Sequence, residues 1–183
     1  MPETLTRIII FTLLGLMLFC NRKANVVRIF IKQITVFKNY NSNKTSIWDL
    51  LCFLFFPIIV SVLFVESLDY TISNEVATIL STVFSIIFTV LFGFASIIVG
   101  KIESNNKIEK QVIEETFISV LSSTILSLIA TILSVIIPIL GNKNTVIREI
   151  LSITLLSISL ITIMLMLVIT KRTFKVYCKK ENK

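Results

Sequence analysis

The chain has 183 residues, of which 55% are hydrophobic and only 16% are charged, and its formal net charge is +7 with no histidine. Soluble domains carry about 25% charged residues, and here the charges cluster between long uncharged runs, so lipid is the expected solvent. The three cysteines are widely spaced, and without histidine they leave no plausible zinc ligand set. We therefore expect no metal site and no cofactor.

The first apolar segment, residues 8–21, is shorter than the ~20 residues that a spanning helix needs. It fits a signal-peptide core, a short span or a re-entrant segment, although no small-residue cleavage site follows it. Because it is apolar on all sides, lying flat on the membrane would leave half its surface in water. We expect the segment to insert, whether or not it crosses completely.

The next segment, residues 25–38, has the period of an amphipathic helix. One face carries Val26, Val27, Phe30, Ile31, Ile34 and Phe37, and the other carries Arg28, Lys32, Gln33 and Lys38. This pattern predicts a helix lying in the membrane interface. A helix packed against protein uses the same periodicity and is the alternative interpretation.

Four longer uncharged runs follow, at residues 50–65, 76–100, 116–142 and 150–170. The first is short, but Ile47 and Trp48 extend it, and Pro57 is expected to kink it. The predicted fold class is all-α. It is a polytopic membrane helix bundle with four spanning helices, a short inserted N-terminal segment and an amphipathic interfacial helix. The expected parts are residues 1–44 (short segment and basic amphipathic helix), 45–170 (transmembrane bundle) and 171–183 (basic cytoplasmic tail).

Basic residues concentrate on one predicted side of the membrane, which the positive-inside rule makes cytoplasmic, together with the C-terminus. This cytoplasmic basic face comprises Arg22, Lys23, Arg28, Lys32, Lys38, Lys171, Arg172, Lys175, Lys179 and Lys180. We expect the tail to bind anionic lipid, and docking to a soluble partner or contact with nucleic acid are the alternatives. The opposite side carries an outer acidic rim of Glu66, Asp69 and Glu75. These acids are either solvated loop charges or a cation-concentrating ring in an oligomer.

Small or weakly polar residues recur at helical spacing in two of the runs. The first row is Thr78, Thr82, Ser85, Thr89, Gly93, Ser96 and Gly100, and the second is Ser119, Ser123, Ser127, Ala130 and Ser134. Helices in lipid gain from close backbone approach, which small residues permit, so both rows are predicted helix-packing seams. Three interpretations remain: packing within one subunit, packing between copies, or a hydroxyl-lined pore. One row can serve the first role while the other serves the second.

The predicted spans contain no deeply placed charge, and no base accompanies the many serines, so we expect no catalytic residues and no enzymatic activity. Proton relays and coupled transporters need charged groups within the membrane. Two functions remain on these grounds. One is a binding and signalling module that holds a cytoplasmic protein partner. The other is an ion channel or a holin-like permeabiliser.

The segments NEVATILSTVFSIIFTVLFGFASIIVGK, EETFISVLSSTILSLIATILSVIIP and LITIMLMLVITKRTFKVY resemble small multi-span proteins of bacterial anti-phage loci. The family they resemble is the membrane subunit of the Kiwa defence system. The resemblance implies a homo-oligomeric sensor, a tetramer, in the bacterial inner membrane. It also implies a soluble, DNA-binding effector on the cytoplasmic side, so that direct nucleic acid binding by this chain itself is not expected.

Overall fold

The computed structural model describes residues 26–36, 47–99, 107–140 and 145–181. Within these ranges the chain is helical except for the short connection between Ser67 and Asn74, and it forms no strand. The prediction of an all-helical chain is confirmed for this part of the sequence. The expected N-terminal insertion of residues 8–21 lies outside the described residues. The helical elements are α2 (Val26–Val36), α3 (Ile47–Leu50), the π-helical turn η1 (Leu51–Phe55), α4 (Phe56–Ser67), α5 (Asn74–Val99), α6 (Lys107–Leu140) and α7 (Thr145–Glu181).

Three of these helices are long and apolar enough to cross a membrane. Their apolar portions are Asn74–Val99, Lys110–Ile139 and Val146–Phe174, and a shorter apolar helix covers Leu51–Ser67. The predicted spans at 76–100, 116–142 and 150–170 therefore coincide with α5, α6 and α7. The helix α7 continues through residue 170 to Glu181, so the first part of the predicted basic tail is helical.

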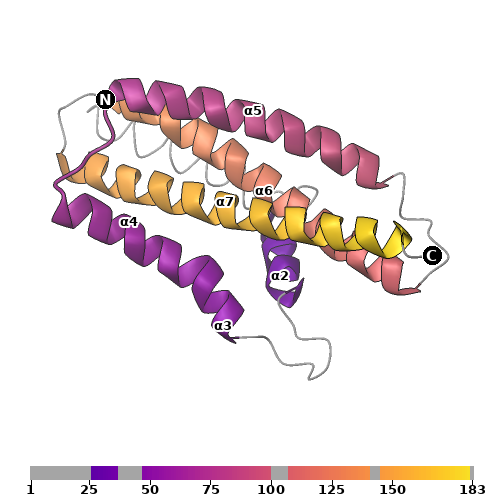
Figure 1. Cartoon of the computed structure of the whole chain (residues 1–183). Helices are drawn as coiled ribbons and strands as arrows, with labels where there is room; N and C mark the ends of the chain where they lie inside the picture. The colour runs from indigo at the N-terminus through magenta and orange to yellow at the C-terminus, as the bar shows by residue number, and fades with distance from the viewer. Residues whose placement is uncertain (1–25, 37–46, 100–106, 141–144, 182–183) are drawn as a thin grey trace.

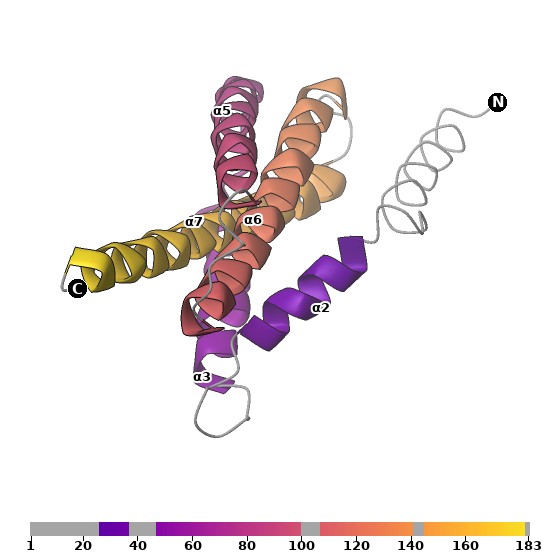
Figure 2. The ribbon, with the colours of Figure 1, turned by 90° about the vertical axis from the view of Figure 1, so that its right-hand side faces the viewer.

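The helices α6 and α7 pack against each other at the centre of the bundle (Figure 1). The helix α5 packs on α6, whereas α4 packs on α7, and this places α4 and α5 at opposite edges (Figure 1). The helix α2 contacts α6 and runs across the long axis of the bundle, as the two views together show (Figures 1 and 2). The two edge helices consequently leave most of their apolar surface uncovered.

The bundle has two chemically different ends. At one end, the Arg148 end, the chain passes from α4 to α5 and from α6 to α7 (Figure 1). At the other, the Arg172 end, lie the last turns of α5 and the first turns of α6, with Arg172 of α7 beside Glu115 of α6. Polar contacts concentrate at these two ends.

The helical run from Ile47 to Ser67 is continuous but changes its winding at η1. There the Phe56 N–H donates to the Leu51 carbonyl, five residues back, instead of the usual four. Proline has no N–H and its ring clashes with the carbonyl one turn earlier, so a wider turn beside Pro57 relieves that conflict. Pro57 itself is buried, and the kink predicted from it stays a prediction.

Apolar side chains fill the helix contacts in three groups. Near the Arg148 end, α5 and α7 meet α6 through Ala77, Phe84, Ala130, Ile137 and Leu155. Towards the Arg172 end, the packing residues are Leu91, Ala95, Ile98, Val120 and Ile169. A third group joins Leu126 and Leu165 to Phe30 of α2 and to Phe53 of η1. The third group therefore ties the N-terminal elements to the central helix pair.

Candidate functional site

The row of small residues on α6 lies inside the bundle. Ser119, Ser123, Ser127, Ala130 and Ser134 are all completely buried. Their hydroxyls donate to carbonyls of their own helix, for example Ser123 Oγ to Ser119 O at 2.9 Å and Ser134 Oγ to Ala130 O at 2.8 Å. The serines thus bring α6 close to its neighbours without leaving unpaired buried hydroxyls.

The row on α5 lies on the surface instead. Thr78, Thr82, Ser85, Thr89, Gly93 and Ser96 are all exposed, and Gly100 lies outside the described residues. The face of α5 that packs on α6 carries Ala77, Phe84, Leu91, Ala95 and Ile98, which is nearly opposite at 100° per residue. A methyl group added at Gly93 would meet no atom of the described chain within 4 Å beyond its two chain neighbours and the backbone of its own helix turn.

The exposed α5 hydroxyls are already paired with the α5 backbone. Thr78 donates to Asn74 O at 2.9 Å, Ser85 to Ser81 O at 2.8 Å, and Thr89 to Ser85 O at 2.9 Å. Thr82 and Ser96 make the same contact one turn back. The α5 row and the α6 row therefore share one hydrogen-bonding pattern and differ in whether another helix covers them. Whether the α5 row is a seam between copies stays a prediction.

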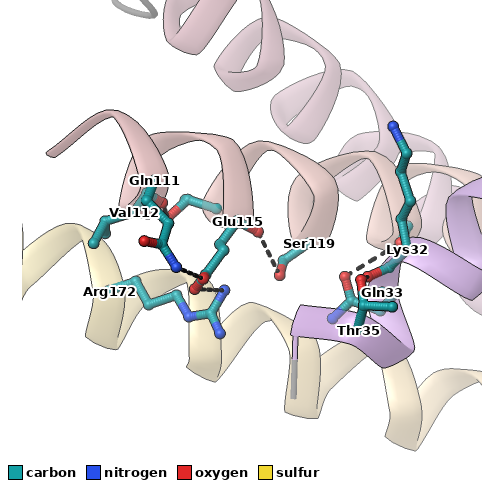
Figure 3. Close-up of polar contacts among 10 residues, drawn as sticks. Lys32, Gln33, Thr35, Gln111, Val112, Glu115, Ser119 and Arg172 are labelled. Atoms are coloured by element: carbon teal, nitrogen blue, oxygen red, sulfur yellow. Dashed lines mark hydrogen bonds and ion pairs between the residues drawn. The ribbon is translucent and has the colours of Figure 1, made fainter. Parts of the chain in front are cut away.

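An ion pair joins α6 to α7 at the Arg172 end (Figure 3). Arg172 Nη1 lies 3.7 Å from Glu115 Oε2, and Gln111 Nε2 donates to Glu115 Oε1 at 3.1 Å. The Arg172 and Glu115 side chains are 20% and 32% exposed. At 3.7 Å the contact is an ion pair but not a hydrogen bond, and Arg172 Nη1 has no hydrogen-bond acceptor among the described residues.

The helix α2 reaches the same stretch of α6 through Gln33 (Figure 3). Ser122 Oγ donates to Gln33 Oε1 at 3.4 Å, and Gln33 is only 5% exposed. The sequence pattern assigned Gln33 to the polar face, away from the apolar side chains. In the structure Gln33 turns towards the bundle together with the half-buried Phe30 of the apolar face, whereas Val27, Ile31 and Ile34 of the apolar face are exposed.

The predicted charged faces are only partly described. Of the cytoplasmic basic face, Arg28, Lys32 and Lys171 are exposed and Arg172 is half-buried in its ion pair. The side chains of Arg22, Lys23, Lys38, Lys175, Lys179 and Lys180 lie outside the described set. The outer acidic rim residues Glu66, Asp69 and Glu75 are all exposed near the Arg148 end, and Asp69 has a positive φ of 46° in the turn after α4.

A contact that the sequence analysis did not identify holds the α4–α5 connection to α7. Arg148 donates to the Ile72 carbonyl from Nε at 3.1 Å and from Nη2 at 2.8 Å, and Nη2 also donates to Asn74 Oδ1 at 3.1 Å. Ser152 Oγ accepts the Ile72 N–H at 3.1 Å. We call this arrangement the Ile72 clamp. The available signal was an arginine one turn into an apolar helix, opposite a connection that contains no base.

Comparisons of the chain with protein-family models, with curated proteins and with solved structures give no match. The class of the protein is therefore inferred from its fold. It is an α-helical bundle with three helices of membrane-spanning length and composition. Polar contacts close both ends of this bundle, and one edge helix presents an uncovered row of small residues.

Proposed function

We propose that the chain is a non-enzymatic integral membrane protein that assembles with copies of itself and acts as a sensor and scaffold for a cytoplasmic effector. The observation that carries this proposal is the exposed α5 row. Its hydroxyls need no partner and its glycine has open space, so a second helix can approach the α5 backbone closely. The α6 row of this same chain is packed in that manner.

We place four spans in this assembly. The continuous helical run from Ile47 to Ser67 is about 30 Å long at 1.5 Å per residue, which matches the hydrocarbon thickness of a bilayer. The Arg172 end faces the cytoplasm, because the positive-inside rule favours that side for basic residues such as Lys32 and Lys171. The outer acidic rim then faces the opposite compartment.

The α5 row favours a second copy of the chain as its partner. Its residues repeat at intervals of three and four, close to the heptad spacing of left-handed helix pairs. Two copies inserted in the same orientation present identical rows to each other around a two-fold axis. A bacterial anti-phage role, in which the assembly reports envelope damage to a soluble effector, is the part of this proposal that rests on the resemblance to the Kiwa membrane subunits.

Cysteine cross-linking in native membranes tests the assembly. Ser85→Cys and Ser96→Cys lie in the row, and Ile86→Cys and Ile97→Cys are matched controls on an adjacent exposed face of α5. We expect disulfide-linked dimers for the row positions and few for the controls. Equal cross-linking at both faces, or none at the row, would contradict the proposal. Pull-down of a cytoplasmic partner that requires the basic tail tests the scaffold role.

A channel or holin-like permeabiliser is the second candidate. The observation that favours it is the exposure of the α5 hydroxyl row together with the three exposed acids of the outer rim. In that case the row would line a pore between subunits instead of a dry contact. Single-channel recording of the purified oligomer in planar bilayers separates the two, because a scaffold gives a silent bilayer.

A further inference from the structure

The helix α2 has two opposite faces that are suited to different surroundings. Val27, Ile31 and Ile34 fall on one side at helical spacing and are 43%, 57% and 41% exposed. Gln33 and Val36 fall on the other side and are buried against the bundle. The outward side of α2 therefore combines these three apolar side chains with Arg28 and Lys32, whereas the inward side packs Phe30 and Val36 on the bundle and buries one polar amide, that of Gln33. This arrangement suits a helix whose outer surroundings are lipid.

The position of α2 in the bundle also indicates that lipid lies next to it. It runs across the long axis of the bundle (Figures 1 and 2) and meets α6 at Ser122, about 10 Å along the helix from Glu115, the last charged residue of α6. With the long helices spanning a bilayer, α2 lies along its surface near the headgroups. Arg28 and Lys32 are exposed on α2, so this surface is complementary to anionic lipid.

The polar contact that holds α2 on α6 is incomplete. The Ser122–Gln33 hydrogen bond is long, at 3.4 Å, and the buried Gln33 Nε2 has no acceptor among the described residues. A buried amide without a partner shifts an equilibrium by on the order of tenfold to a hundredfold against the state that buries it. The docked position of α2 is weakened by that amount, and any state that gives Gln33 an acceptor is favoured.

We propose that α2 is a lipid-responsive helix that exchanges between this docked position on α6 and a released position in the anionic surface of the bilayer. In the released position the Gln33 amide donates to a headgroup phosphate, and Arg28 and Lys32 lie among anionic lipids. Gln33 gains an acceptor only in the released position, and the two bases gain closer contact with anionic headgroups there, so the anionic lipid content shifts the ratio of the two positions. The inference rests on the membrane placement in the proposed function and adds the regulated element and its stimulus.

The test uses spin labels on the full chain in lipid nanodiscs. Labels at Thr35→Cys of α2 and Glu114→Cys of α6 occupy exposed positions, and Cys20, Cys52 and Cys178 are replaced by serine. Pulsed electron resonance then measures the distance between the labels in phosphatidylcholine and in an equal mixture with phosphatidylglycerol. We expect a docked short distance in the neutral lipid. In the mixture we expect a longer-distance population whose ratio to the docked one rises about tenfold.

The variant Gln33→Leu removes the unpaired donor, and Ser122 Oγ, which loses Gln33 Oε1 as its acceptor, can donate to a carbonyl of its own helix as Ser119 and Ser123 do. We expect its ratio of docked to released α2 to rise about tenfold in both lipids, while the response to phosphatidylglycerol, which comes from Arg28 and Lys32, remains. Ser122→Ala, which removes the remaining hydrogen bond, should release α2 further. Inorganic phosphate added to neutral nanodiscs should have no effect. The inference is overturned by a distance distribution that is the same with and without phosphatidylglycerol, by a Gln33→Leu variant with the docked-to-released ratio of the wild type, or by release with free phosphate alone.

The cross-linking of α5 in the same nanodiscs keeps the two proposals separate. Row-specific cross-links with a lipid-insensitive α2 reject only the docking exchange. A lipid-sensitive α2 without row-specific cross-links rejects only the assembly through α5.

Discussion

Replacing Arg148 by alanine should destabilise the whole bundle, because this side chain donates two hydrogen bonds to one buried carbonyl. The Ile72 carbonyl belongs to a residue with no exposed surface, and it accepts both Arg148 Nε and Nη2. A hydrogen bond to a charged donor contributes about 1.5–3 kcal/mol, and an orphaned buried carbonyl costs about 1–3 kcal/mol. These two energies are not added, because losing the hydrogen bonds and orphaning the carbonyl are the same event. Arg148 is also partly exposed, so we expect the free energy of unfolding to fall by ~2–4 kcal/mol in total.

The expected loss corresponds to a fall of about 5–15 °C in the unfolding temperature of a chain of this size. Thermal unfolding in a fixed detergent, followed by circular dichroism, measures it. Arg148→Lys should lose roughly half as much, because an ammonium cannot donate from two fixed positions to one carbonyl. Thr154→Ala on the same helix is the control: its exposed hydroxyl bonds only to Ile150 O, and we expect a change within ~0.5 kcal/mol.

A second substitution tests whether the contacts of the Ile72 clamp stabilise the protein cooperatively. Ser152→Ala removes the acceptor of the Ile72 N–H, and its combination with Arg148→Ala should deviate from additivity by more than ~0.5 kcal/mol, since both act on the backbone of Ile72. If Arg148→Ala unfolds at the temperature of the Thr154→Ala control, the clamp does not stabilise the protein and this reasoning is refuted.

Three further substitutions probe other contacts. Gly93→Leu should leave the unfolding temperature of the monomer unchanged or slightly higher, since open space surrounds it, but should abolish cross-linking through α5; loss of folding would contradict this. Ser127→Leu on the buried α6 row should cost ~1–3 kcal/mol by overpacking, measured as the unfolding temperature, and a neutral result would refute the tight contact. Arg172→Met should cost about 1 kcal/mol, and Glu115→Gln in the same chain should restore most of it; no restoration would show that the ion pair is not what Arg172 contributes.

The existence and type of the long helices could be predicted from sequence because one simple property determines them. Charged residues are excluded from a bilayer interior, so uncharged runs mark α5, α6 and α7 to within a few residues at their lipid-facing portions. Helix ends were less predictable. The helix α6 starts at Lys107, well before the uncharged run, because charged residues outside the lipid are equally compatible with a helix.

The partners of each helix face could not be predicted. Periodicity showed that small residues share one side of α5 and one side of α6, but it carries no information on which side another helix covers. For α2 the same limit misplaced Gln33. The side of α2 that contacts the bundle carries Phe30 and Val36 as well as Gln33, so burial follows the position of α6 and not the division of α2 into an apolar and a polar face. Arg148 was missed because its acceptor is a backbone carbonyl, which leaves no trace in side-chain patterns.

The internally bonded hydroxyls of α5 bear on how such a protein is made. Each threonine and serine of the row already donates to a carbonyl of α5, so exposure to hydrocarbon leaves no hydroxyl donor without an acceptor. A freshly inserted chain can therefore dwell alone in the bilayer without penalty from this face. In the proposed assembly, pairing through this row would therefore follow insertion and depend on the density of subunits in the membrane.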